Sequence, residues 1–374
     1  MSTEPIRVAI CGLGMVAQAV YVPLLLRRPE SFQISAVVDL SDERRDAMAD
    51  RLRIGPADRF ATVDDLIAAE AADAALLLTS GSHGAEARAL LDADIAVLCE
   101  KPLAYTLAEA KRLEGADRLL LGYMKLFDPA VEAAATAISD IGAIRGVEVT
   151  VLHPSPERQL HHLGGPSFLP GTPPPTALQS LDKVDLQRRN EALGPDAGDG
   201  ISKLYSNVIL GSVVHDLAVT RVLAGAPTEV RHADWWDTAE GGRSVSFDAL
   251  LPGGGRMTLF WHLLPDYPSY REEVRIHGEY GSISLAFPAP YLMNAPTELE
   301  IRLTDGDDQR VIRPQSYAEA FDRELTHFLA VARDHERPRV TAADGAADIR
   351  TSQRIARAVA ASQGVELGGE AATA

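Results

Sequence analysis

The stretch Ile6-Arg7-Val8-Ala9-Ile10-Cys11-Gly12-Leu13-Gly14-Met15-Val16-Ala17 decides the fold. Its first half is short, mostly apolar and rich in β-branched residues, which predicts a buried strand. The glycines that follow predict a tight turn at Gly12 and a backbone at Gly14 that a pyrophosphate can approach. Ala17 is small enough for a following helix to pack closely on the strand, and phosphate would lie at the helix N-terminus. The pattern therefore predicts the first unit of a dinucleotide-binding Rossmann domain.

An acid at the end of the next strand indicates which dinucleotide binds. The predicted strand Gln33–Val38 leads directly into Asp39. A carboxylate there accepts hydrogen bonds from the adenosine ribose and repels a 2′-phosphate, which favours NAD over NADP. The alternative is that Asp39 caps the helix predicted over 42–53.

Two more strand ends carry polar residues at the same predicted edge of the sheet. The run Ala74–Leu78 stops at Thr79 and Ser80, whose small side chains leave room for the cofactor. His83 follows at the start of a helix and fits a catalytic base, a helix cap or a surface residue.

The strand Ile95–Cys99 runs straight into Glu100-Lys101-Pro102. Pro102 disfavours helical geometry for the residue before it, so Lys101 is expected in an extended conformation at the strand end. Ligands of open α/β sheets bind at such ends. The Lys101 amine is therefore expected to point into a ligand site at this edge of the sheet.

Composition excludes several classes of protein. The chain has 374 residues, 46% of them hydrophobic, and a formal charge of -17, which argues against binding to nucleic acid or to an anionic membrane. Cys11 and Cys99 lie in apolar strands, as expected in a reducing cytoplasm. No secretory signal and no run of 18 apolar residues is present, so we expect a soluble cytoplasmic protein. His161-His162 lacks matching ligands nearby in the sequence, and no metal site is predicted.

The second half of the chain predicts a different α/β domain. Residues 144–152 alternate as a strand, and six further β-rich runs between 229 and 303 predict an antiparallel sheet. Residues 153–205 form a proline-rich insertion with little apolar periodicity, as expected for an irregular lid, binding loop or oligomer arm. Helices are predicted within 317–362, and the tail from Gly368 is expected to be disordered. The predicted domains are 1–125 and 126–374.

In its order of motifs, the chain resembles the Gfo/Idh/MocA family of oxidoreductases. The resemblance rests on the glycine-rich turn, on Thr79 followed by His83, on Glu100-Lys101-Pro102, and on Gly122-Tyr123 leading to Asp128-Pro129. It implies an N-terminal Rossmann domain and a C-terminal α/β domain with a large, mostly antiparallel sheet that forms a homodimer or homotetramer interface. It also implies hydride transfer between a nicotinamide and a sugar, polyol or cyclitol, with Lys101 near the reacting oxygen. Removing hydride from a carbinol carbon requires a base for the hydroxyl proton. The resemblance therefore makes Lys101 the candidate base, and Glu100 is expected to orient or neutralise it.

The helix predicted over 207–223 resembles the family's catalytic helix, in which a histidine hydrogen-bonds substrate. His215 takes that place, but Gly211 occupies the position of the acid expected four residues earlier. Ser212 lies on the same predicted helical face as His215, whereas Asp216 lies about 100° away. Either the insertion supplies the acid, or proton transfer relies on Lys101 and His215.

The resulting site prediction has three parts. The predicted catalytic residues are Lys101 and His215. The predicted cofactor-binding residues are Gly12, Leu13, Gly14, Met15, Val16, Asp39, Thr79, Ser80, His83, Glu100 and Lys101. The predicted substrate contacts are Tyr123, Lys125, Asp182 and Ser212.

Three functions are consistent with these residues. The first is an NAD-dependent dehydrogenase or ketoreductase acting on a carbohydrate-like substrate. The second is a reductase of an imine or a conjugated double bond, which needs no acid at Gly211. The third is a nucleotide-binding protein that has lost catalysis and serves regulation or assembly.

Overall fold

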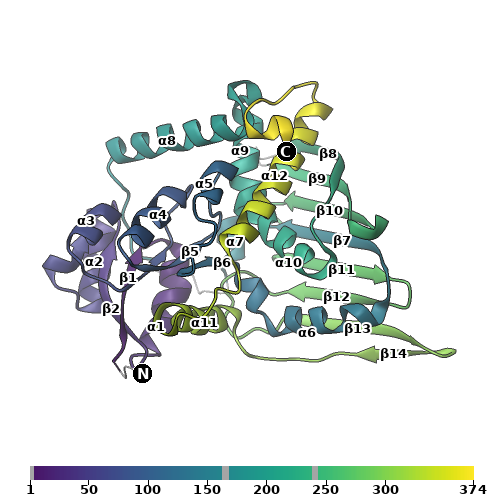
Figure 1. The fold of residues 1–374 in the computed structure, drawn as a ribbon, viewed down its shortest axis with the longest axis horizontal. Helices are drawn as coiled ribbons and strands as arrows, with labels where there is room; N and C mark the ends of the chain where they lie inside the picture. The colour runs from purple at the N-terminus through teal and green to yellow at the C-terminus, as the bar shows by residue number, and fades with distance from the viewer. Residues whose placement is uncertain (1–3, 162–167, 238–242) are drawn as a thin grey trace. The chain divides into compact units, whose positions relative to one another are not determined.

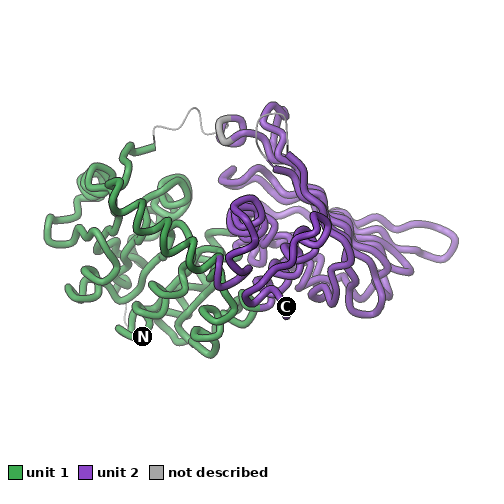
Figure 2. Tube along the Cα trace, turned by 90° about the horizontal axis from the view of Figure 1, so that it is seen from above, with its two compact units in different colours: residues 1–123, 167–189, 321–346 green, residues 124–166, 190–320, 347–374 purple. Residues whose placement is uncertain are grey.

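The computed structural model describes residues 4–161, 168–237 and 243–374. The chain forms two compact units, which Figure 2 distinguishes by colour. Unit 1 combines residues 1–123 with 167–189 and 321–346, and unit 2 contains 124–166, 190–320 and 347–374. The predicted domains were continuous ranges, whereas each unit is assembled from three separate stretches of chain.

Unit 1 is built on a six-stranded parallel sheet in the order β3-β2-β1-β4-β5-β6. Figure 1 labels four of these strands, β1, β2, β5 and β6. The strand order reverses between β1 and β4, and ligands of such sheets bind at that reversal. This topology confirms the predicted Rossmann fold; only the two-residue β3 was not predicted. The strands are β1 Ile6–Cys11, β2 Phe32–Val38, β3 Arg59–Phe60, β4 Ala74–Leu77, β5 Ala96–Glu100 and β6 Leu119–Gly122.

Three helices of unit 1, α2, α3 and α5, begin at side-chain caps. The side chains of Ser41, Thr62 and Thr106 each accept a hydrogen bond from a first-turn amide, which satisfies a donor that the helix itself leaves open. The helical segments are a π-helical turn Ala17–Tyr21, α1 Val22–Leu26, α2 Asp42–Leu52, a 3-10 turn Pro56–Asp58, α3 Val63–Ala68, α4 Gly84–Asp92, α5 Leu107–Lys111, α8 Pro175–Leu193 and α11 Ala320–Asp334. Helix α8 continues past unit 1 by its last four residues.

Unit 2 is built on an eight-stranded sheet in the order β14-β13-β12-β11-β7-β10-β9-β8. Among the described residues, β7 and β10 are the only neighbouring strands of this sheet that run parallel, which confirms the predicted mostly antiparallel sheet. Alternate residues of β11, from Glu272 to Ile276, are buried, as expected for a sheet with one covered face. The strands are β7 Ile144–His153, β8 Glu229–Asp237, β9 Arg243–Leu250, β10 Arg256–Leu263, β11 Arg271–Gly278, β12 Gly281–Phe287, β13 Glu298–Asp305 and β14 Asp308–Ile312, the last not predicted.

The helical segments of unit 2 correct one expectation. The segment 153–205 was expected to be irregular, yet its described residues, 153–161 and 168–205, include the helices α7, α8 and α9, of which α8 has 19 residues. The segments are η3 Met124–Phe127, α6 Pro129–Ala137, η4 Ile138–Ile141, α7 Pro156–Gln159, η6 Pro195–Ala197, α9 Gly198–Lys203, the π-helical η7 Leu204–Val213, α10 Val214–Ala224, η8 Pro252–Gly254, α12 Ala342–Ser362 and η9 Glu370–Thr373.

The continuous helical stretch Pro195–Ala224 is long and apolar enough, by composition alone, to cross a membrane. However, 56% of its most apolar window is buried inside the protein. Core helices of soluble proteins meet the same criterion, so this stretch is weak support for a membrane span.

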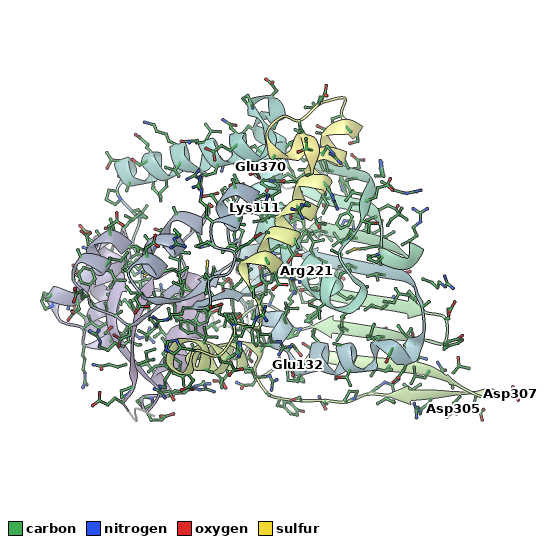
Figure 3. The ribbon with its side chains drawn as sticks, in the orientation of Figure 1. Lys111, Glu132, Arg221, Asp305, Asp307 and Glu370 are labelled. Carbon is green, nitrogen blue, oxygen red and sulfur yellow. The ribbon has the colours of Figure 1, made fainter. Side chains whose placement is uncertain are left out.

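The C-terminal tail also differs from expectation. Residues from Gly368 were predicted to be disordered, but Glu370–Thr373 forms a 3-10 turn with Ala371 fully buried. Glu370, labelled in Figure 3, accepts a hydrogen bond from Gln353 of α12 at 2.7 Å. Arg357 of α12 also donates to the Ala371 and Ala372 carbonyls, so a buried alanine and several side-chain hydrogen bonds hold this end of the chain.

Candidate functional site

The glycine-rich turn lies at the reversal of strand order in unit 1. Gly12 has φ +91°, and a Cβ placed there would lie 2.6 Å from the backbone carbonyl of Leu78. Any other residue would separate the turn from the end of β4. Gly14 has no atom within 4 Å of its notional Cβ, so its backbone faces open space. A helix begins directly after it, at Met15. This combination leaves room for a phosphate at the first free amides of the helix.

Asp39 is fixed at the end of β2 by both carboxylate oxygens. Oδ2 accepts from the Leu13 amide at 2.9 Å and Oδ1 accepts from the Ser41 amide at 2.8 Å. Arg44 lies 3.6 Å from Oδ2. The helix cap is Ser41 and not Asp39, because the Ser41 hydroxyl accepts from the Arg44 amide. Asp39 thus ties the glycine-rich turn to β2, and each of its oxygens retains a lone pair for a ribose hydroxyl.

His83 joins two loops at the same edge of the sheet. It is 1% exposed, its Nδ1 lies 2.6 Å from the Pro102 carbonyl oxygen, and its Nε2 lies 2.8 Å from the Thr79 carbonyl oxygen. Carbonyl oxygens only accept, so both contacts are hydrogen bonds only when both ring nitrogens carry hydrogen. The suggestion that His83 is a surface residue is wrong, and its side chain caps no helix. His83 instead links the end of β4 to the lysine turn after β5.

The Glu100-Lys101-Pro102 turn follows β5, and the Lys101–Pro102 peptide is cis. Glu100 is buried: its Oε2 accepts from the Lys101 amide at 3.1 Å, and its Oε1 lies 3.2 Å from the Tyr21 hydroxyl. Burial raises the pKa of Glu100, while the Lys101 charge and these hydrogen bonds oppose that rise. The Glu100 carboxylate therefore supports the lysine turn from inside the unit.

Residues 168–189, here called the covering segment, cross this edge of unit 1. The Leu169 amide donates to Gln18 at 2.7 Å, and Arg44 donates to the Gly171 carbonyl. Further along, Asp185 approaches Gly81 after β4, and a Cβ on Gly81 would lie 2.9 Å from its carboxylate. Arg188 pairs with Glu109 of α5 at 3.1 Å. One segment thus touches the first helix and the regions after β2, β4 and β5.

These residues fit the diphosphate and ribose of a dinucleotide. The turn leaves the backbone at Gly14 open, the helix offers its N-terminus, and Asp39 stands at the end of the neighbouring strand. Leu13 is fully buried and contributes its amide to Asp39, whereas Met15 is partly exposed beside the open face. Thr79 donates to Glu86 at 2.8 Å, and Ser80 is exposed.

The predicted substrate helix in unit 2 is not regular. Residues 204–213 are π-helical, and the Val214 amide donates to the Ile209 carbonyl five residues back. The prediction that Gly211 and Ser212 lie on the same helical face as His215 assumed α-helical spacing. That assumption is wrong for residues 204–213, because a π-helix has more residues per turn than an α-helix. The Ser212 hydroxyl accepts a hydrogen bond from Trp261 Nε1 at 2.9 Å.

A buried charged cluster lies beside His215. Asp216 is 2% exposed, and it shares a hydrogen bond with Glu272 of β11. Glu272 forms an ion pair with Lys125 and accepts from the Tyr270 hydroxyl at 2.6 Å. Burial and the neighbouring Glu272 charge raise the pKa of Asp216 well above its usual value. Burial alone would raise the pKa of Glu272, but Lys125 and the hydrogen bonds lower it. The pair therefore holds one proton, on Asp216.

The remaining predicted substrate residues are divided between the two units. Lys125 is committed to Glu272 and lies 4.7 Å from the Phe287 ring centroid. Tyr123 is buried in unit 1 at the end of β6, and Asp182 is exposed on α8. Sequence reasoning did not find Tyr21, Glu272 or the contacts of Gly171, because no local pattern links them to a site.

Within residues 4–161, 168–237 and 243–374, no group of three or more His, Cys, Asp or Glu side chains has the arrangement of a metal site. His162, which adjoins His161, lies outside the described residues.

The match to a known protein family lies in unit 1. Residues 6–117 match the family model for Gfo/Idh/MocA proteins, described as an oxidoreductase family with an NAD-binding Rossmann fold. Inositol 2-dehydrogenase 2 of Paenarthrobacter aurescens is 26% identical over 375 residues, covering 95% of both chains. Inositol 2-dehydrogenase of Arthrobacter sp. is 31% identical over 145 residues, covering 37% of this chain and only 42% of that enzyme.

Solved structures extend the likeness of fold to nearly the whole chain. UDP-N-acetylglucosamine 3-dehydrogenase from Acidithiobacillus ferrooxidans aligns with a TM-score of 0.65 and 21% identity, covering 96% of this chain and 98% of that one. Aldose-aldose oxidoreductase from Caulobacter crescentus aligns with a TM-score of 0.70 and 18% identity over the same shares. The predicted α/β architecture is confirmed.

Proposed function

Because this chain belongs to the Gfo/Idh/MocA family of oxidoreductases, we propose that it transfers a hydride between NAD and a hydroxyl or keto carbon of a sugar, sugar derivative or cyclitol. The observation that carries the proposal is the lysine turn at Lys101, which lies on the same sheet edge as the glycine-rich turn and Asp39. A relative that aligns over 95% of both chains, an inositol 2-dehydrogenase, supports a cyclitol or sugar as substrate.

In this proposal, bound NAD supplies the hydride acceptor, and the residues of the chain manage the proton. Lys101 accepts the hydroxyl proton in oxidation and returns it in reduction. Glu100 holds the lysine turn through the Lys101 amide. His215 hydrogen-bonds the substrate oxygen.

The preference for NAD rests on Asp39. Its carboxylate is buried and accepts one hydrogen bond from a backbone amide on each oxygen. A ribose 2′-phosphate bound at this strand end would bring a second negative charge close to it. Two cations lie nearby. Arg44 contacts Asp39 and the Gly171 carbonyl, and Arg45 donates to the Asp39 carbonyl and pairs with Asp42. Titration with both dinucleotides should give tighter binding of NAD than of NADP.

The test of the proposed reaction is NAD reduction with a panel of inositols, aldoses and sugar nucleotides. We expect Lys101→Ala to lower kcat at least about a hundredfold, the usual contribution of a positioned acid–base group, while NAD binding persists. Lys111→Ala, a change to a lysine in the last turn of α5, is the control and should leave kcat unchanged. A Lys101→Ala enzyme with full activity would contradict the assignment.

A second candidate function is reduction of an imine or conjugated double bond. It is favoured by Gly211, which provides no carboxylate, and by Asp216, whose carboxyl is bonded to Glu272. Activity on such substrates, with none on alcohols or ketones, would select this reading over the first.

We further propose a soluble cytoplasmic protein that forms a homodimer or homotetramer through the sheet of unit 2, without nucleic-acid partners. The acidic composition and the relatives among metabolic dehydrogenases support this proposal. Sedimentation analysis of the purified protein measures the oligomeric state.

A further inference from the structure

Glu324 is a buried acid to which the proposed reaction assigns no role. It lies on α11 and is 0% exposed. Its Oε2 lies 2.9 Å from the Tyr21 hydroxyl oxygen, and its Oε1 contacts no partner in the described part of the chain. An ionised carboxylate buried with one oxygen unsatisfied would be costly. The position therefore calls for an explanation of its charge.

The single hydrogen of the Tyr21 hydroxyl provides that explanation. The hydroxyl oxygen lies 2.9 Å from Glu324 and 3.2 Å from Glu100, and it carries a single hydrogen. Two ionised carboxylates would both need that hydrogen. Both contacts are hydrogen bonds only if one carboxyl is protonated and donates to the Tyr21 oxygen, while Tyr21 donates to the other.

The surroundings decide which carboxyl carries the proton. Glu100 faces Lys101 and His83, and its second oxygen accepts from the Lys101 amide. Among the described residues, the side chains that shift the pKa of Glu324 are Tyr21 and the negative Glu100. Burial, together with the Glu100 charge, raises the pKa of Glu324 well above its usual value. The proton therefore belongs on Glu324.

We propose that Glu324 is a neutral carboxylic acid that donates to Tyr21, which in turn donates to Glu100. These two hydrogen bonds keep Glu100 ionised and oriented behind Lys101. Glu324 is thus a positioning residue for the reaction proposed above, and the inference rests on that function for its kinetic part. No proton is transferred along these two hydrogen bonds: the hydrogens stay on Glu324 Oε2 and on the Tyr21 oxygen.

Infrared spectroscopy tests the charge assignment without any substrate. At pH 7.5 the wild-type protein should show a carbonyl band of a protonated carboxylic acid that Glu324→Gln removes. Asp322→Asn makes the same acid-to-amide change on the same helix, at an acid that pairs with Arg28, and should leave that band in place. Absence of the Glu324-dependent band overturns the proposal, even in a protein with full activity.

Kinetics test the positioning role. The amide of Glu324→Gln can donate to Tyr21 as the neutral acid does, so kcat/KM should stay within about twofold of wild type. Glu324→Leu and Tyr21→Phe each interrupt this series of hydrogen bonds. Each variant should have a kcat/KM about tenfold lower, the loss expected for one hydrogen bond to a charged group, and a shifted pH profile. Thermal unfolding confirms that each variant is folded.

The outcomes separate the two proposals. A Glu324→Leu enzyme with a wild-type rate and pH profile, or a Glu324→Gln enzyme as impaired as Glu324→Leu, overturns the positioning role. A wild-type protein that shows the Glu324-dependent band but has no oxidoreductase activity retains the charge assignment and loses the proposed function.

Discussion

Asp216 shows how one buried proton links charge to stability. Its raised pKa means that the folded protein binds a proton that the unfolded chain releases above its ordinary pKa. The stability associated with this group is therefore complete at low pH and declines as pH rises towards the raised folded-state pKa. The sign is the reverse of that for a surface aspartate in a salt bridge.

We predict that Asp216→Asn becomes relatively more stable as pH rises. The asparagine amide can donate to Glu272 as the protonated acid does, but it has no proton to lose. Urea unfolding at pH 5 and pH 8 should show a difference from wild type that moves in favour of the variant at pH 8. Asp322→Asn is the control, and an equal effect at both pH values would contradict the prediction.

At the residue scale, the sequence predicted what local motifs determine. Gly12, Asp39 and Lys101 follow directly from strand ends and glycine spacing, and the structure places all three at one edge of unit 1. The partners Tyr21–Glu324 and Asp216–Glu272 join residues far apart in the sequence, and no local pattern announces such a pair. The role of a site residue that depends on such a distant partner therefore cannot be assigned from the sequence and stays a prediction.

At the scale of elements, the main surprise is α8. The sequence suggested an irregular segment because Leu178, Leu181, Val184 and Leu186 give no single apolar face, and all four are exposed. Helical propensity without an amphipathic stripe leaves no periodic signal. By contrast, the strands of the second sheet alternate clearly, and the structure confirms them.

The covering segment gives a second prediction, which concerns cofactor retention. Gly171 has φ +131°, and a Cβ there would lie 2.4 Å from the Ser41 hydroxyl and 2.9 Å from the Arg44 amide. Gly171→Val should displace the segment from Arg44 and raise the dissociation constant of NAD about tenfold, roughly the value of one hydrogen bond to a charged group. Calorimetric or fluorescence titration measures this change.

Gly306→Val is the matched control for Gly171→Val. Gly306 also has a positive φ, +62°, but no atom lies within 4 Å of its notional Cβ, and it belongs to the β13–β14 turn. Gly306→Val therefore introduces backbone strain without a steric clash, and this variant should bind NAD as the wild type does. Equal effects of the two substitutions would attribute the loss to strain in general and contradict a role for the covering segment.

At the scale of the whole molecule, unit 1 depends on a helix encoded far from its sheet. Phe321 of α11 packs edge-on against Tyr21, with ring centroids 5.7 Å apart. Arg28 binds Asp322 and Thr326 of the same helix, and Arg333 donates to the Ser31 carbonyl. The sequence predicted this helix but grouped it with the second domain, because amphipathic periodicity shows that a helix buries one face without showing against what.

We predict that residues 1–125 alone do not form a stable domain. The buried side chains Phe321, Leu325, Phe328 and Val331 would be missing, at about 1.5–3 kcal/mol each, a total comparable to the stability of a typical domain. Circular dichroism of this fragment should show no cooperative unfolding. A fragment that unfolds as sharply as the full chain would contradict the prediction.

The three-stretch construction of unit 1 also has a consequence for synthesis on the ribosome. The six strands emerge first, but helix α11 follows only after most of unit 2 has been translated. At about 5–20 residues per second, the sheet would wait on the order of 10–45 s for its last helix. During that interval the apolar surface around Tyr21 has no native cover, and this nascent chain is a natural client for a chaperone.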